Sequence, residues 1–254
     1  MTLILPQIGG SFSEFVDVLG LGITGLETWH DATDLSTLFT DSAKTTAVTT
    51  TGDRVGCWVD KSGNGFDFTQ TTAGLRPIYD TTTMTQESLS FTGSSGGREW
   101  LYNATDKQTF MVFVVVEVSG TNSNVLFGFD AADNRYAYYE VGATTYSTGS
   151  DTGYTTVGGG YAGLVPRNDP HILTIDCRNY INMDFTEYLM AFQQQTAGTP
   201  AGTYVGRRHN LPNNEAPFTG NVVELLTYNR KLTATEVADV EDYLNTKHSI
   251  GLTR

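Results

Sequence analysis

The sequence predicts an all-β protein: a two-sheet antiparallel jelly-roll sandwich with one C-terminal α-helix. The 254-residue chain carries 27 Gly, 13 Tyr and 13 Phe. Aromatic and β-branched side chains favour strands, and Gly favours tight turns. Short apolar segments separated by turn clusters follow one another from Leu26 to Tyr228, and a clear helix pattern comes only after them. This order favours antiparallel sheets packed face to face in one domain.

The first 25 residues are expected to form an arm that precedes the sandwich domain of residues 26–254. Glycines limit any helix here to one or two turns, and so short a segment does not fold alone. It must therefore lie on the sandwich or on a neighbouring subunit. The apolar residues at helical spacing, which we interpret as an assembly arm, are Phe12, Phe15, Val16 and Leu19.

Around ten segments are predicted as strands from their apolar and aromatic residues and the turn residues that bound them. The apolar run 110–116 indicates a central strand that is buried on both faces. The Gly/Thr/Ser-rich stretch 142–160 is expected to be a loop. The expected strands are 25–29, 54–59, 88–91, 109–118, 124–129, 136–141, 171–175, 189–192, 203–206 and 221–228.

The helix is predicted over residues 234–247. Thr233 and Glu236 form a capping box, in which each side chain satisfies an exposed backbone amide of the first turn. Acidic residues crowd the first half, and Lys247 and His248 follow at the end, which suits the helix dipole. The apolar stripe expected to face the sheet is Val237, Val240 and Leu244.

Charge and hydropathy exclude two classes of partner. The net charge is −13 and the pI is near 4.5, so nucleic acid would be repelled. A membrane-spanning helix needs about 18 apolar residues, and no uncharged apolar stretch in the sequence is nearly that long. The first basic residue is Lys44, so no classical export signal is expected.

For Cys57 and Cys177, two buried thiols are favoured, and a cross-sheet disulfide is the alternative.

Three segments resemble the laminin G-like and concanavalin A-like jelly-roll domains found in many bacterial and phage proteins. They are Leu-Glu-Thr-Trp-His-Asp at 26–31, the stretch 55–65 followed by 76–79, and the stretch 218–233 running into the helix. The last segment is the most specific, and the three together bracket residues 26–250. The resemblance implies a lectin-like jelly roll whose relatives bind glycans, bind proteins or cleave glycosidic bonds.

Catalysis is not expected. Glycoside cleavage needs two carboxylates placed as acid and nucleophile. The hydrolases of similar fold carry Glu-x-Asp-x-x-Glu on one strand, and this string is absent from the sequence. The acidic residues on strands that keep a hydrolase as a distant alternative are Glu27, Glu117, Glu140 and Glu224.

Aromatic residues offer a carbohydrate-binding site, since the apolar faces of sugar rings pack on aromatic rings. Trp58 lies between Cys57 and Val59 in a predicted strand and is expected in the core. Arg207 begins a local cationic stretch, suited to an acidic partner or to a solvated turn. The residues predicted to contact a sugar are Trp100, Tyr138, Tyr146 and Tyr154.

No cofactor is expected, with bound calcium as an alternative. Asp60 and Asn64 stand where a calcium loop would begin, but the positions for its last ligands hold Phe68 and Thr71. A polar turn is therefore favoured there. The same choice applies to the second candidate, Asp130 with Asp133.

Two functions follow from these observations. The first is a non-catalytic structural protein of a bacteriophage virion, a capsid decoration (cement) or accessory appendage subunit, bound to a major capsid protein or to its own copies. The second is a carbohydrate-binding module of a receptor-binding tail or fibre protein. No nucleic-acid or membrane partner is expected in either case.

Overall fold

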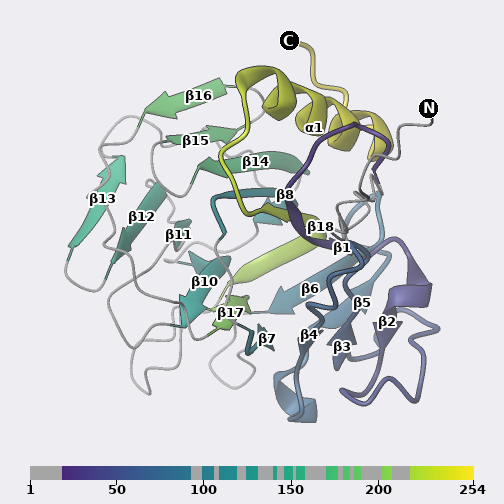
Figure 1. The fold of residues 1–254 in the computed structure, drawn as a ribbon. Helices are drawn as coiled ribbons and strands as arrows, with labels where there is room; N and C mark the ends of the chain where they lie inside the picture. Colours follow the sequence, from purple (N-terminus) through teal and green to yellow (C-terminus); the bar gives the residue numbers. More distant parts are fainter. Residues whose placement is uncertain are drawn as a thin grey trace, which may run out of the picture.

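The computed structural model shows two antiparallel β-sheets packed face to face, with one α-helix, α1 (Ala234–Lys247), in the part of the chain it describes (Figure 1). The predicted fold class is thus confirmed. The described residues are 19–92, 99–105, 109–118, 124–130, 140–141, 146–150, 153–157, 170–176, 180–183, 186–189, 202–207 and 218–254.

The larger sheet has eight strands in the order β16-β15-β14-β8-β18-β6-β5, with β1 also paired to β18. One edge of β18 pairs with β8, and the other edge pairs first with β6 and then with β1. A register shift between Val222 and Glu224 interrupts the β18–β8 pairing. The strands are β1 (Leu26–Asp31), β5 (Ile78–Asp80), β6 (Ser88–Thr92), β8 (Met111–Val118), β14 (His171–Asp176), β15 (Tyr180–Met183), β16 (Thr186–Leu189) and β18 (Thr219–Tyr228).

The smaller sheet has six strands in the order β10-β17-β7-β4-β3-β2. They are β2 (Leu38–Phe39), β3 (Cys57–Trp58), β4 (Phe68–Thr69), β7 (Leu101–Asn103), β10 (Phe127–Asp130) and β17 (Gly202–Val205). A third, four-stranded sheet contains β9 (Asn124–Val125), β11 (Glu140–Val141), β12 (Tyr146–Ser150) and β13 (Gly153–Val157). Two short 3-10 helices, η1 (Leu35–Thr37) and η2 (Ala73–Leu75), lie in connections.

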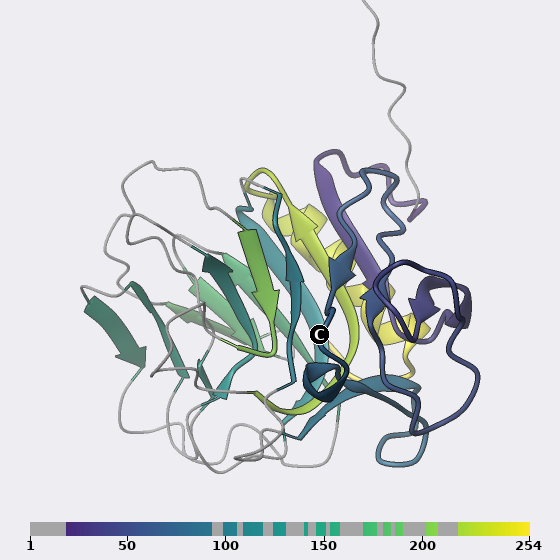
Figure 2. The same ribbon diagram turned by 90° about the horizontal axis from the view of Figure 1, so that it is seen from below.

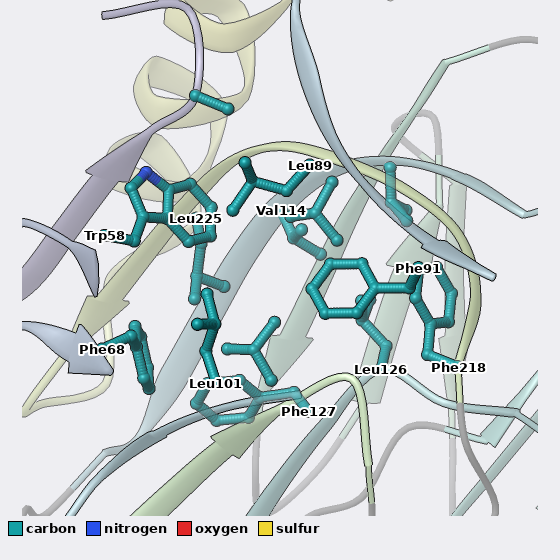
Figure 3. Close-up of a cluster of buried hydrophobic side chains, with 14 of the residues drawn as sticks. Trp58, Phe68, Leu89, Phe91, Leu101, Val114, Leu126, Phe127, Phe218 and Leu225 are labelled. Carbon is teal, nitrogen blue, oxygen red and sulfur yellow. The ribbon is translucent and has the colours of Figure 1, made fainter. Parts of the chain in front are cut away.

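Two hydrophobic clusters hold these layers together. The inter-sheet core fills the space between the two large sheets, and it includes Trp58, Phe68, Leu101 and Val114 (Figure 3). The helix-side core lies on the other face of the larger sheet, where side chains of β8 and β18 meet the helix. Seen from below, the strands lie in front of this helix (Figure 2). Every residue of β8 is buried, which confirms the prediction from its apolar run.

The helix is the most accurately predicted element. It spans Ala234–Lys247 as expected, Thr233 and Glu236 form the capping box, and Val237, Val240 and Leu244 are buried. No helix in the described ranges has both the length and the apolar character to cross a membrane.

The strand predictions differ from the structure in several places. The loop expected over 142–160 is wrong, because β12 and β13 pair there as an antiparallel hairpin. The Thr and Tyr residues of this stretch favour strands, and their preference prevails over that of the glycines for turns. Only Cys57–Trp58 of the segment 54–59 is a strand. Short strands β2, β4, β5 and β7 were not expected, because two or three residues show no clear alternation.

The first thiol behaves as predicted. Cys57 is free and fully buried in β3. Burial, with a smaller contribution from the nearby charge of Asp67, raises the pKa of this thiol to about 12. Cys177 lies outside the described residues.

Candidate functional site

An aromatic cluster lies on the outer face of the smaller sheet. Leu101 of β7 and Val205 of β17 belong to the inter-sheet core. Because neighbouring side chains on a strand point to opposite faces, Tyr102 and Tyr204 point outward. These two tyrosines stand directly opposite each other in the β7–β17 register. Trp100 lies two residues before Tyr102, on the same face.

The rings of this cluster contact one another in a defined arrangement. Tyr102 and Tyr204 are stacked, with centroids 4.5 Å apart and planes 27° apart. Trp100 stands edge-on, at 5.5 Å and 62° to Tyr204 and at 6.4 Å and 71° to Tyr102. The guanidinium carbon of Arg207 lies 4.8 Å from the centroid of the Trp100 ring and 5.1 Å from that of Tyr204. We call these four residues the aromatic cluster.

The four residues differ in exposure. Tyr204 and Arg207 are buried, with 3% and 8% of their surface exposed. Trp100 and Tyr102 are half-buried and keep part of their surface open to solvent. The buried pair therefore forms a floor, and Trp100 and Tyr102 are the members that a ligand can reach.

A glycine gives Tyr102 its place. A Cβ atom at Gly202 would lie 2.5 Å from Cε2 and Oη of Tyr102, and 2.6 Å from the carbonyl oxygen of Asn103. The ring therefore lies directly against the backbone of β17, in space that any other residue at this position would fill.

The Trp100 backbone is fixed by the loop after β4. Its amide donates to the carbonyl oxygen of Leu75 at 3.0 Å, and its carbonyl oxygen accepts from Gln70 Nε2 at 3.3 Å. Arg76 holds the loop itself, since its guanidinium donates at 2.8 Å to each of three carbonyl oxygens, those of Thr40, Gln70 and Thr71.

Only one predicted sugar-contacting residue lies in this cluster. Trp100 does, whereas Tyr146 and Tyr154 lie on β12 and β13 of the four-stranded sheet. Tyr138 is outside the described residues. Tyr102 and Tyr204 were not among the residues predicted from the sequence. The pattern Trp100-Leu101-Tyr102, in which two aromatic residues flank an apolar one, indicates that Tyr102 lies on the same face as Trp100.

Arg207 was predicted only as part of a cationic stretch. In the structure its side chain is buried against two aromatic rings, which is unlike a solvated turn. Arg207 and Trp100 are far apart in the sequence. They meet because β17 and β7, the strands next to them in the chain, are neighbours in the smaller sheet.

The first calcium candidate has the contacts of a polar turn. The Asp60 carboxylate accepts hydrogen bonds from the amides of Trp29, Ser62 and Phe66 at 2.9 to 3.0 Å, and from Ser62 Oγ at 2.8 Å. Asn64 Nδ2 donates to the carbonyl oxygens of Leu26 and Glu27. These contacts favour the turn over a metal site.

The described residues contain no group of three or more His, Cys, Asp or Glu side chains that could hold a metal ion. Of the second calcium candidate, Asp130 ends β10. Asp133 lies outside the described residues.

A second group of polar residues lies at the junction of β1, β18 and α1. We call it the ionic cluster, and its members are Trp29, Asp31, Lys61, Glu224, Tyr243, Lys247 and His248. Lys247 Nζ contacts Asp31 at 2.7 Å and Glu224 at 2.8 Å, and Lys61 Nζ contacts Asp31 at 3.1 Å. Glu224 also accepts from Trp29 Nε1 at 2.6 Å, from Tyr243 Oη at 3.3 Å and from His248 Nε2.

This cluster joins the three sequence segments that carry the family resemblance. Trp29 and Asp31 come from the segment 26–31, and Lys61 comes from the segment 55–65. The remaining members come from β18 and from the helix and the residue after it. The segments are far apart in the chain, but their polar residues meet here. These polar residues thus fasten the first strand and the helix to the larger sheet, which is a structural role.

Three of the four carboxylates considered for catalysis, those of Glu27, Glu117 and Glu224, are buried and accept hydrogen bonds from neighbouring side chains. Glu27 accepts from Thr109 and Thr227 hydroxyls, and Glu117 accepts from Asn221 Nδ2 at 2.6 Å. Both are buried, as is Glu224. For Glu140 the structure gives the backbone position in β11. No described contact brings Glu27, Glu117 or Glu224 to the aromatic cluster.

Solved structures share this fold, whereas no protein-family model and no curated protein matches the chain. Trypanosoma rangeli sialidase in complex with sialic acid superposes with a TM-score of 0.56 and 11% identity, over 91% of this chain and 34% of the sialidase chain. The chain thus spans about a third of that enzyme. A second structure of the same sialidase, with 2,3-difluorosialic acid, gives 0.55 at 12% identity over the same shares of both chains.

A third match is nearly complete for both proteins. Domain 4 of AbnA, a GH43 extracellular arabinanase from Geobacillus stearothermophilus, in complex with arabinotriose, gives a TM-score of 0.54 and 15% identity. It covers 85% of this chain and 98% of that domain. At these identities the similarity shows a shared lectin-like β-sandwich. It supports the fold implied by the sequence resemblance, while the phage origin stays a prediction.

Proposed function

We propose that the chain is a non-catalytic carbohydrate-binding module, which contacts sugar through Trp100 and Tyr102. The aromatic cluster carries this proposal, because two half-buried rings stand on a buried floor on the outer face of a sheet. Apolar faces of sugar rings pack on such rings. Similarity to an arabinanase domain solved with arabinotriose supports the choice of ligand class.

The contacts of the carboxylates support a role without catalysis. Glycosidases place two carboxyl groups on either side of the bond that they cleave. Glu99 is the chain neighbour of Trp100, and both of its carboxylate oxygens accept hydrogen bonds from Thr92. Hydrolysis of a bound glycan by the purified chain would contradict this part of the proposal and favour the hydrolase alternative.

A glycan array tests the proposal, probed with the purified chain in calcium and again in EDTA. We expect binding in both conditions, and Trp100→Ala should weaken it about tenfold, because stacking of this kind contributes about 1 kcal/mol or more. Leu35→Ala is a matched control, since Leu35 is an exposed apolar residue outside the aromatic cluster. Absence of binding to any glycan in either condition would overturn the proposal.

A role in a bacteriophage virion, as a decoration or appendage subunit, is the second candidate. One observation favours it: Leu19 and Leu21 pack against the helix-side core. An arm that precedes Leu19 therefore starts from the face of the sandwich opposite the aromatic cluster. Such an arm can contact a capsid protein or another copy while the sugar site stays accessible.

Deletion of residues 1–18 tests this second role. The deletion spares Leu19 and Leu21, so the sandwich should unfold at an unchanged temperature. We expect the shortened chain to stop co-sedimenting with particles that contain the major capsid protein. Unchanged co-sedimentation would exclude the arm as the assembly contact.

A further inference from the structure

The two accessible rings of the aromatic cluster form a corner. The planes of Trp100 and Tyr102 are 71° apart, with centroids 6.4 Å apart. Tyr204 cannot extend either ring into a flat platform, because it is 3% exposed and lies in the floor.

This corner matches one sugar unit. A sugar ring that stacks on one of the two rings must turn its edge toward the other, since the planes are nearly perpendicular. Successive units of a straight, sheet-like polysaccharide present parallel faces and need coplanar aromatic rings. Only one such unit can contact both Trp100 and Tyr102, so a straight chain gains little from its other units.

The charge inside the cluster restricts the ligand further. A cation placed over aromatic rings is stabilised by their electron-rich faces. Arg207 already occupies this position, with its guanidinium carbon 4.8 Å and 5.1 Å from two ring centroids. A ligand ammonium group would find this place over the two rings already filled by the guanidinium, whereas a neutral or acidic sugar does not need it.

We propose that the aromatic cluster recognises a single neutral or acidic sugar unit at the end, or at a bend, of a soluble glycan. This inference rests on the carbohydrate-binding function proposed above and narrows its ligand class. It excludes flat insoluble polysaccharides and quaternary ammonium groups as the main ligands.

Gly202 is a positioning residue in this arrangement. A methyl group there would overlap the Tyr102 ring, at 2.5 Å, and push it from its seat. The corner would open without the loss of any aromatic side chain. The same methyl group would lie 2.6 Å from the carbonyl oxygen of Asn103. Gly202→Ala should therefore weaken binding more in a chain that still has the Tyr102 side chain than in one that lacks it.

The experiment compares four probes: an array of soluble oligosaccharides, microcrystalline cellulose, free choline and a polyproline peptide. The wild-type chain should bind soluble glycans that share one exposed sugar unit, and the free monosaccharide of that unit should compete. Trp100→Ala and Tyr102→Ala should each weaken binding about tenfold, whereas Leu35→Ala should not change it.

A double-mutant cycle tests the positioning role. Gly202→Ala should weaken binding by a larger factor in the wild-type background than in the Tyr102→Ala background, where only the contact with the Asn103 carbonyl oxygen remains. The difference between the two factors is the coupling through the Tyr102 ring. An equal further loss in the Tyr102→Ala background would overturn this role. If Gly202→Ala fails to fold, the two aromatic variants still test the corner.

The outcomes separate the inference from the function on which it rests. Binding to cellulose as tight as to soluble glycans, with the same loss in Trp100→Ala, would overturn the single-unit inference and leave the carbohydrate-binding function standing. Binding to choline or polyproline but to no glycan would overturn both, as would binding to none of the four probes.

Discussion

Glu224 is fully buried in the larger sheet, yet its carboxylate contacts the polar side chains of Trp29, Tyr243, Lys247 and His248. A buried charge is tolerated only where such partners replace water. The same set of contacts leaves the carboxylate no open side for a substrate. Its burial therefore explains its structural value and agrees with the proposal of a non-catalytic function.

Removal of this charge should destabilise the fold. Glu224→Gln leaves two basic side chains beside a neutral amide, and we expect the free energy of unfolding to fall by about 3 kcal/mol. Urea denaturation measures the change. Glu87→Gln is the matched control, because Glu87 is an exposed carboxylate near β6, and its loss should change stability little. Equal effects of the two variants would contradict the role given to Glu224.

Asp31 should make stability depend on pH in the acidic range. Burial would raise the pKa of Asp31, but Lys247, Thr33 and Lys61 together outweigh it and lower this pKa from 3.8 to about 2. A carboxyl group with a lowered pKa in the folded state stabilises the fold above its unfolded pKa. That contribution is lost as the pH falls from about 4 to about 2.

The size of this contribution is about 2 kcal/mol. Urea denaturation between pH 5 and 2 should show the loss in the wild-type chain, and a flatter profile in Asp31→Asn. Asp239→Asn provides a control at an exposed carboxylate of α1. A wild-type profile as flat as that of Asp31→Asn would contradict the assignment.

At the scale of single residues, the sequence predicted the burial of Trp58 but not the neighbours of Trp100. Trp58 was expected in the core because its neighbours are apolar, and it is fully buried. Trp100 was proposed as a ligand contact, but one of its partners, Tyr204 of β17, is about a hundred positions away in the chain. Local pattern indicates which face a residue occupies, and only the sheet order determines what lies beside it.

The helix α1 combines local signals with long-range contacts. Its capping box depends on residues within one turn, which is why the sequence predicted its bounds correctly. Arg230 adds to this N-terminus, with Nη2 2.5 Å from a Glu236 oxygen, and helps to lower the pKa of Glu236 to about 2. At the other end, Lys247 and His248 were expected to act on the helix dipole. They also bind Glu224 of β18, a contact that no local pattern contains.

Loss of the cap should weaken the attachment of this helix. Thr233→Ala removes the hydroxyl that accepts from the Glu236 amide, and we expect a loss of about 1 kcal/mol in the free energy of unfolding. Thr235→Ala is the matched control, because Thr235 is exposed in the same helical turn and Ala is a better helix former. The cap has no role if both substitutions have the same effect.

At the scale of the whole molecule, the two outer faces of the sandwich carry different kinds of side chains. The face of the larger sheet carries the helix, the ionic cluster and the first described residues Leu19 and Leu21. The C-terminal residues Ile250 and Leu252 pack on the same core. The outer face of the smaller sheet carries the aromatic cluster. The sandwich class was predictable from composition and spacing, but this division depends on which strands pair, and that information is spread over the whole chain.

This separation predicts how the chain can be attached to a surface. A chain immobilised through a biotin after Arg254 should bind soluble glycans as it does in solution, because that attachment lies on the helix side. A chain immobilised through a cysteine that replaces Thr69 should lose binding, since Thr69 pairs with Tyr102 and lies beside the aromatic cluster. Both proteins need a Cys177→Ser background, whereas the native Cys57 is buried and its high pKa keeps it unreactive at neutral pH. Surface plasmon resonance with a glycan from the array compares the two orientations. Equal binding in both would place the ligand on another face of the sandwich and would contradict the site proposed here.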